Sequence, residues 1–91
     1  MRPSILLTRR IPSSVVVKLE AACELDVYAG RDAIGRPELI ERVAGKQALI
    51  CLLTDRIDAE VLNAGADLRI VANIAVGYNN IDVEACRARG I

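Results

Sequence analysis

Residues 69–90 read RIVANIAVGYNNIDVEACRARG and contain one complete strand, loop and helix. The run at 69–76 is apolar and rich in β-branched residues, which is typical of a buried strand, and Gly77 follows it. Asp82 stands where a side chain can cap the first turn of a helix, and Gly90 stands where that helix can end. This stretch therefore predicts one β-strand followed by one α-helix.

Three more units of the same kind precede it. The run ALICLLT at 48–54 has the continuous apolar character of a strand that is buried on both faces. Prolines and capping residues indicate the helix starts, and Gly45 is placed to end the second helix. The expected strands span 4–8, 24–30, 48–54 and 69–76, and the expected helices begin at Pro12, Pro37, Asp58 and Asp82.

This alternation indicates a parallel sheet, because parallel strands can be joined only by crossover connections such as helices. The crossovers are right-handed in nearly all proteins, and they place helices on both faces of the sheet. We therefore expect an α/β fold, a flavodoxin-like doubly wound parallel sheet that is incomplete, with about four strand–helix units. Ligands of such sheets bind beyond the carboxyl ends of the strands, so the loops there are the candidate sites.

The composition describes one small domain with an aliphatic core. Hydrophobic residues make up 53% of the 91 residues but aromatic ones only 2%, so aliphatic side chains must fill the core. Twelve Lys and Arg residues balance twelve Asp and Glu residues, which leaves no basic surface for nucleic acid. No apolar run approaches the roughly 20 residues that span a bilayer, and the amino terminus carries no signal-peptide pattern. We therefore expect a cytoplasmic protein that binds neither nucleic acid nor membrane, with Cys23, Cys51 and Cys86 buried as small apolar side chains.

The residues for several kinds of catalysis are missing. The sequence contains no histidine, the commonest general acid or base. No two of its six glycines are separated by a single residue, so a dinucleotide fingerprint is absent. Asp55 and Asp58 form a spaced pair of carboxylates, which helix capping explains more simply than a metal site. We predict no catalytic, cofactor-binding or metal-binding residue in this chain.

Three segments resemble a known enzyme family. They read ILLTRRIP at 5–12, LLTDRIDAEVLNAG at 52–65 and LRIVANIAVGYNNIDVEACRARGI at 68–91. In this order they resemble the amino-terminal part of the D-isomer-specific 2-hydroxyacid dehydrogenases, in particular the glyoxylate and hydroxypyruvate reductases. Where that family usually has Asp in its most specific motif, this chain has Asn79, which removes one charge but keeps a turn-forming residue.

The resemblance implies a two-domain enzyme that uses NAD or NADP to reduce small 2-keto acids to D-2-hydroxy acids. Residues 1–91 would be the N-terminal segment of its substrate-binding domain, without the nucleotide-binding domain. The full-length parent would bind NAD or NADP, and this segment alone would bind neither. The arginine, histidine and glutamate that the family uses on its substrate have no counterpart among these residues, because in the family they lie further along the chain.

The resemblance also implies part of a substrate site at the end of the last strand. The family holds the substrate carboxylate partly with main-chain N–H groups that match Val76 and Gly77. Gly77 has no Cβ to block an anion and can adopt a positive φ, which points successive N–H groups into one concavity. Tyr78 and Asn79 would shape the cleft wall, and Leu53 matches a position that packs against the substrate. A plain turn at Gly77 and a plain core role for Leu53 are the alternatives.

Two other functions stay open on the sequence alone. The chain could be a stand-alone module that binds small anions, or a remnant that buries its exposed edge strand and helix faces by self-association. For the dehydrogenase interpretation, the partner is a small 2-keto or 2-hydroxy acid. An incomplete sheet also predicts a homo-oligomer or a marginally stable chain, because unpaired strand edges are templates for association.

Overall fold

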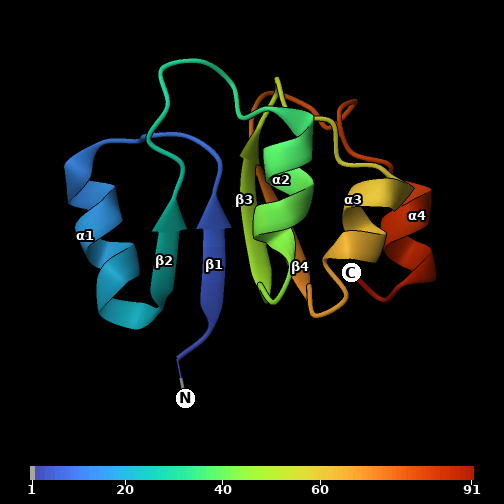
Figure 1. Ribbon diagram of the computed structural model, residues 1–91, viewed down its shortest axis with the longest axis horizontal. Coiled ribbons are helices and arrows are strands. Elements are labelled where there is room, and N and C mark those ends of the chain that lie inside the picture. Colours follow the sequence, from blue (N-terminus) through green and yellow to red (C-terminus); the bar gives the residue numbers. More distant parts are fainter. Residues whose placement is uncertain (1) are drawn as a thin grey trace.

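The computed structural model describes residues 2–91 as one parallel sheet with helices packed around it (Figure 1). The strand order is β2-β1-β3-β4, and every neighbouring pair is parallel. This confirms the predicted α/β class. In chain order the elements are β1 (Ser4–Leu7), α1 (Ser13–Ala22), β2 (Glu24–Val27), α2 (Arg36–Val43), β3 (Ala48–Leu52), α3 (Ala59–Ala64), β4 (Ile70–Ile74) and α4 (Val83–Ala88).

The strand order creates a topological switch between β1 and β3. From β1 the chain crosses outward to β2, then returns past β1 to β3 and continues to β4. The register pairs Leu6 with Leu49 and Leu49 with Val71, so the carboxyl ends of these three strands share one edge of the sheet. Loops at that edge can converge on a ligand.

The helices begin where the sequence predicts. The Asp58 side chain accepts a hydrogen bond from the Val61 N–H group (3.3 Å), and the Asp82 side chain accepts one from the Ala85 N–H group (3.0 Å). Each bond satisfies an N–H group that has no partner within its own helix. Pro37 lies in the first turn of α2, where its missing N–H group costs nothing.

The strands end one to three residues earlier than predicted. After Leu52, at the end of β3, the Asp55 N–H group bonds to the Leu52 carbonyl oxygen (2.9 Å) and closes a turn. After Ile74, at the end of β4, the chain bends through Gly77. Apolar residues such as Leu53 continue beyond the last ladder hydrogen bond, so hydrophobicity alone extends the predicted strands too far.

The core lies between the sheet and the helices α2, α3 and α4 (Figure 1). Cys23, Cys51 and Cys86 are buried and unpaired with one another, which confirms their predicted role as small apolar side chains. By contrast, α1 packs beside β2 and has no buried residue. No helix of residues 2–91 is long and apolar enough to cross a membrane. The core residues are Leu6, Ile34, Leu39, Val43, Leu49, Cys51, Ile57, Val61, Leu62, Leu68 and Cys86.

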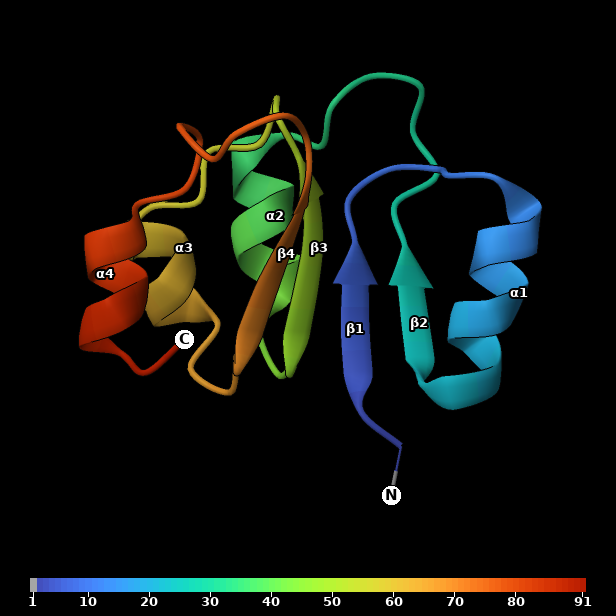
Figure 2. The same ribbon diagram turned by 180° about the vertical axis from the view of Figure 1, so that it is seen from behind.

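The prediction that β3 is buried on both faces is wrong. Leu49 and Cys51 are fully buried, whereas the alternate residues Ile50 and Leu52 are only partly buried. Figure 2 shows the second side of β3 and β4, with no helix of the described chain in front of these strands. We call this surface the open face; it is formed by Ile50, Leu52, Ile70, Ala72 and Ile74.

Candidate functional site

Several main-chain N–H groups of the loop after β4 have no partner in residues 2–91, those of Val76 and Gly77 among them. Val76 is fully exposed, and Gly77 has a φ of 86°, in the left-handed region. A Cβ atom at Gly77 would meet no atom within 4 Å, so the backbone conformation favours glycine here, and crowding does not. Within residues 2–91, neither the Val76 nor the Gly77 N–H group donates a hydrogen bond. A loop of this kind can offer N–H groups to an anion.

Leu53 and Tyr78 line different cavities. Leu53 is 59% exposed, which excludes a core role, and it lines a cavity of about 300 Å³ together with Asn79. Tyr78 lines a separate cavity of about 400 Å³ over β4 and α4. Val76 and Gly77 form part of neither wall. The structure therefore brings Leu53 and Asn79 together, and it places Tyr78 against α4.

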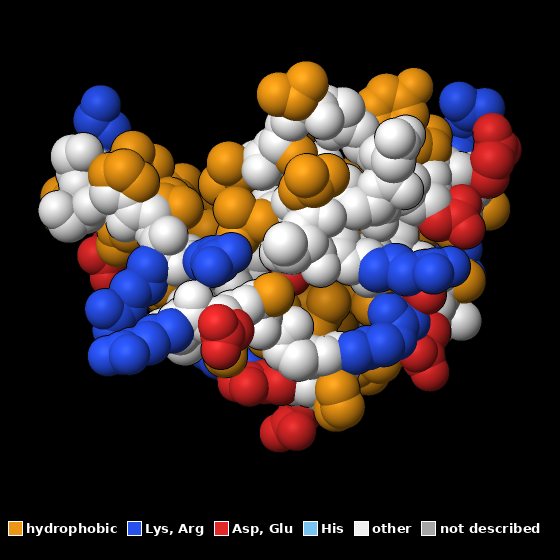
Figure 3. All heavy atoms as spheres, turned by 90° about the horizontal axis from the view of Figure 1, so that it is seen from above, with side chains coloured by type: hydrophobic (Ala, Val, Ile, Leu, Met, Phe, Trp, Pro, Cys, Tyr) orange, Lys and Arg blue, Asp and Glu red, His pale blue; other side chains and the backbone are white. Residues whose placement is uncertain are grey.

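The edge formed by the carboxyl ends of the strands has two unlike sides. In the view onto this edge (Figure 3), hydrophobic side chains gather mainly along one long side, and Lys, Arg, Asp and Glu side chains mainly along the other. The exposed hydrophobic residues include Leu53, Ile74, Val76 and Tyr78, which all belong to β4 or to the loops after β3 and β4. The candidate N–H groups therefore lie in an apolar neighbourhood.

Asp55 has a structural role that the sequence did not reveal. It is 3% exposed, and its Oδ2 atom accepts hydrogen bonds from the Thr8 hydroxyl group and the Leu52 N–H group. Its Oδ1 atom has no partner within residues 2–91. Asp55 therefore joins the carboxyl ends of β1 and β3. The prediction that it caps a helix is wrong, and of the pair Asp55 and Asp58 only Asp58 is a cap.

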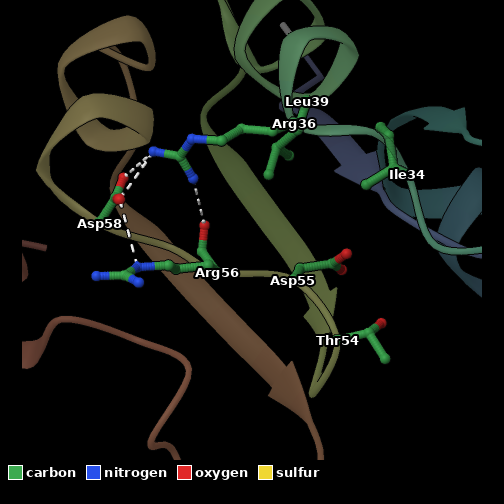
Figure 4. A pocket seen from close by; sticks show the side chains of 7 residues that line it. All are labelled: Ile34, Arg36, Leu39, Thr54, Asp55, Arg56 and Asp58. Atoms are coloured by element: carbon green, nitrogen blue, oxygen red, sulfur yellow. Dashed lines mark hydrogen bonds and ion pairs between the residues drawn. The ribbon is translucent and has the colours of Figure 1, made fainter.

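A cavity of about 430 Å³ lies beside Asp55, and two cationic side chains line it (Figure 4). Both point toward Asp58: the Arg36 Nη2 atom lies 2.7 Å from its Oδ1 atom, and the Arg56 Nε atom lies 3.5 Å from its Oδ2 atom. The Arg36 guanidinium group holds the pKa of Asp58 below its ordinary value. Because both cations are already paired, this cavity is a poorer site for an anion than the open N–H groups after β4.

Comparison with known proteins identifies the family. The model of the D-isomer specific 2-hydroxyacid dehydrogenase catalytic domain matches residues 5–91. The chain belongs to this family. This membership confirms that the three sequence segments were correctly assigned to the D-isomer-specific 2-hydroxyacid dehydrogenases.

The curated relatives of this dehydrogenase-family chain include glyoxylate reductases. The glyoxylate reductase of Korarchaeum cryptofilum is 47% identical over 91 residues, which are 100% of this chain and 27% of the relative. The one of Pyrococcus furiosus is 45% identical with the same coverage. The chain therefore spans about a quarter of the length of the curated relatives it matches.

Solved structures share the fold. A protein from Thermus thermophilus superposes with a TM-score of 0.90 at 38% identity, over 97% of this chain and 28% of that one. The NADPH-dependent glyoxylate/hydroxypyruvate reductase of Sinorhizobium meliloti, solved in complex with NADP and malonate, gives 0.71 at 26% identity over 100% and 27%. In each case the dehydrogenase-family chain matches little more than a quarter of the larger protein.

Two asparagines of this dehydrogenase-family chain were not singled out from the sequence. Asn73 lies inside β4, and its side chain contacts the loop that follows; Asn80 lies in that loop, and its side chain contacts the end of β3. A signal was present, because an amide inside an otherwise apolar strand needs hydrogen-bond partners when it is buried. The identity of those partners depends on the tertiary fold, which strand patterning does not give.

Proposed function

We propose that residues 1–91 form the N-terminal segment of the substrate-binding domain of an NAD(P)-dependent reductase of small 2-keto acids. The substrates would be acids such as glyoxylate and hydroxypyruvate, and the products D-2-hydroxy acids. Family membership and the glyoxylate reductases among the relatives support the reaction class. In this proposal, the chain contributes substrate binding and no proton-transfer or hydride-transfer residue.

One observation carries the proposed role in binding. Val76 and Gly77 have N–H groups without a partner in residues 2–91, at the sheet edge where ligands of parallel sheets bind. Two adjacent N–H groups can stabilise a carboxylate, because a charged acceptor strengthens each hydrogen bond. Leu53, which is exposed at the neighbouring loop, would contact the short carbon chain of the acid.

We expect no dinucleotide site among residues 2–91. A pyrophosphate needs closely spaced glycines at the start of a helix, so that the backbone can approach it. Here the positive-φ glycines are Gly45, Gly77 and Gly90, and none of them precedes a helix directly. NAD or NADP would therefore be held by residues other than those of this chain, and it would supply the hydride.

A titration with glyoxylate tests the carboxylate site. In nitrogen-15 NMR spectra of the 91-residue chain, the Val76 and Gly77 amide resonances should shift as glyoxylate is added, with weak affinity because only part of a site is present. Gly77→Ala should abolish the response, because alanine at a φ of 86° is strained and the backbone will rotate the N–H groups away.

Gly45→Ala is the matched control. Gly45 has a φ of 77° and equally open space around a Cβ atom, so it carries the same strain away from the site. It should lose similar stability and keep the glyoxylate response. The proposed function is refuted if the wild-type amides do not respond, or if both alanine variants lose the response equally.

Self-association is a second candidate function, and the open face favours it. Ile70 and Ile74 are 58% and 44% exposed there, next to the edge of β4 that pairs with no other strand of residues 2–91. Apolar side chains beside an unpaired strand edge promote association of copies of a chain. This candidate concerns another surface than the N–H groups, so both functions can hold.

A further inference from the structure

We propose that Asn73 and Asn80 form an amide clamp that positions the carboxylate-binding N–H groups relative to the loop after β3. The inference rests on the proposed function, and it concerns two residues that touch no ligand themselves. Both would be positioning residues, which act through the Gly77 carbonyl group and through the loop that carries Leu53.

Asn73, in β4, holds the Gly77 carbonyl group, which belongs to the peptide group directly after the Gly77 N–H group. Its Nδ2 atom donates to the Gly77 carbonyl oxygen (3.1 Å) and to the Asn80 Oδ1 atom (2.9 Å), so both of its hydrogens are used. Its Oδ1 atom accepts from the Cys51 thiol (3.4 Å) and from Asn80 (3.2 Å). An anchored strand residue therefore fixes one side of a loop that is otherwise exposed.

Asn80 holds the end of β3 from the other loop. Its Nδ2 atom lies 3.0 Å from the Leu52 carbonyl oxygen and 2.9 Å from the Asp55 carbonyl oxygen, in addition to its contact with Asn73. Its main-chain carbonyl oxygen accepts from the Ile57 N–H group (2.8 Å). The side chain and the main chain of Asn80 thus bind both ends of the turn after β3.

The hydrogen-bond acceptors around the side-chain amides of Asn73 and Asn80 allow only one of the two flipped orientations of each amide. Turning Asn80 over would set its carbonyl oxygen against two main-chain carbonyl oxygens, and turning Asn73 over would set its own against that of Gly77. The two amides are therefore locked by each other and by the backbone around them. Networks of this kind act as a unit, because the loss of one partner leaves the rest unsatisfied.

This arrangement accounts for how an exposed glycine can hold a defined conformation. Gly77 has no side chain of its own to pack, and glycine has the widest conformational freedom. A loop that is ordered before its ligand arrives avoids the entropy cost of ordering it on binding. The clamp fixes the position of the Gly77 carbonyl group relative to the loop that carries Leu53. A site with contributions from both loops requires such a fixed arrangement.

The test compares Asn73→Ala and Asn80→Ala with Asn63→Ala in the 91-residue chain. Asn63 is an exposed residue of α3 whose side chain accepts from Arg89 (2.7 Å), so its removal is the same chemical change away from the loops. Without ligand, both clamp variants should shift or broaden the Gly77 and Leu53 amide resonances, and Asn63→Ala should not.

Glyoxylate affinity, read from the resonances of the folded protein, should fall by about three- to tenfold in either clamp variant, the loss expected for one hydrogen bond. The double variant should lose little more than either single one, because the two amides act together. A merely structural role would lower stability in urea and leave the affinity of the folded molecules unchanged, which would overturn the inference.

The outcomes separate this inference from the proposed function. If wild-type amides do not respond to glyoxylate, the proposed function fails, while the ligand-free spectra still test the clamp. If wild type responds and both clamp variants bind equally well, the clamp is refuted and the carboxylate site stands. Undisturbed Gly77 and Leu53 resonances in both variants would also refute the clamp.

Discussion

The two faces of β3 and β4 carry similar side chains but have different surroundings. On the face toward α2, α3 and α4, Leu49 and Cys51 are completely buried. On the open face, Ile70 and Ile74 are equally apolar, but no helix of residues 2–91 covers them. The difference shows that apolar patterning reports which surfaces a strand can bury, and that the neighbouring elements decide which it does bury.

Leu49→Ala should have the largest effect of the variants that probe this difference. It should lower the free energy of unfolding by about 2–5 kcal/mol, because it removes buried apolar surface and leaves a cavity. Ile70→Ala, the matched change on the open face, should cost less than about 1 kcal/mol. Urea unfolding followed by circular dichroism measures both. Equal losses would show that the open face is covered in solution.

Thiol reactivity gives a second comparison of the faces. Burial raises the pKa of Cys51 to about 12, so the reactive thiolate is scarce in the folded protein. Cys23 and Cys86 are also buried, and the wild-type chain should react with Ellman's reagent only as it unfolds. Ala72→Cys places a thiol on the open face, and it should react at least about a hundredfold faster.

The same pKa predicts a loss of stability at alkaline pH. The folded pKa of Cys51 lies above the ordinary value of 9.0, so its contribution is complete below pH 9.0 and is lost as the pH rises toward 12. Cys51→Ala should flatten that part of the curve of unfolding free energy against pH.

The outcome that would contradict the thiol comparison is a slow reaction of Ala72→Cys, which would mean that another surface protects the open face.

Asp58→Ala tests how much the N-terminal cap of α3 contributes to stability on the covered face. The expected loss is smaller than that of Leu49→Ala. It should lower stability by about 1 kcal/mol, because the Val61 N–H group loses its cap. The Arg36 guanidinium group lowers the pKa of Asp58, so this contribution is present above the ordinary value of 3.8 and disappears as the pH falls through the lowered value.

Glu60→Ala, which removes an Arg36 partner without removing the cap, should change stability less. A loss at Glu60 as large as at Asp58 would assign the effect to the ion pairs.

Local chemistry explains why most of the fold could be predicted. Asp58 and Asp82 mark helix starts by a short-range hydrogen bond, and the alternation of strand and helix restricts the sheet to parallel pairing. The strand ends could not be predicted equally well, because Leu53 is as apolar as a strand residue but lies in a turn. Whether a helix covers each face of β3 depends on elements far away in the sequence. The apolar run of β3 alone therefore cannot predict it.

The candidate site divides in the same way. Gly77 was identified through the resemblance to the family, and the positive φ that a glycine can adopt at this position is present. Leu53 is exposed, which excludes the alternative of a plain core role, and its contact with a substrate stays a prediction. Asp55, Asn73 and Asn80 have partners 47, 22 and 28 residues away along the chain, and pairings across the sheet are set only by the assembled fold.

Ile70→Lys should have the smallest effect on stability and the clearest effect on self-association. The side chain is mostly exposed and lysine can keep its stem on the strand, so the free energy of unfolding should change by less than about 0.5 kcal/mol. If copies of the wild-type chain associate through the open face, Ile70→Lys should lower the apparent mass measured by light scattering toward that of a monomer. Val17→Lys on α1 is the matched control, because it makes the same change at another exposed apolar position. An equal fall in both variants would point to net charge as the cause, and a wild-type chain that is monomeric at every concentration would rule out self-association through either face.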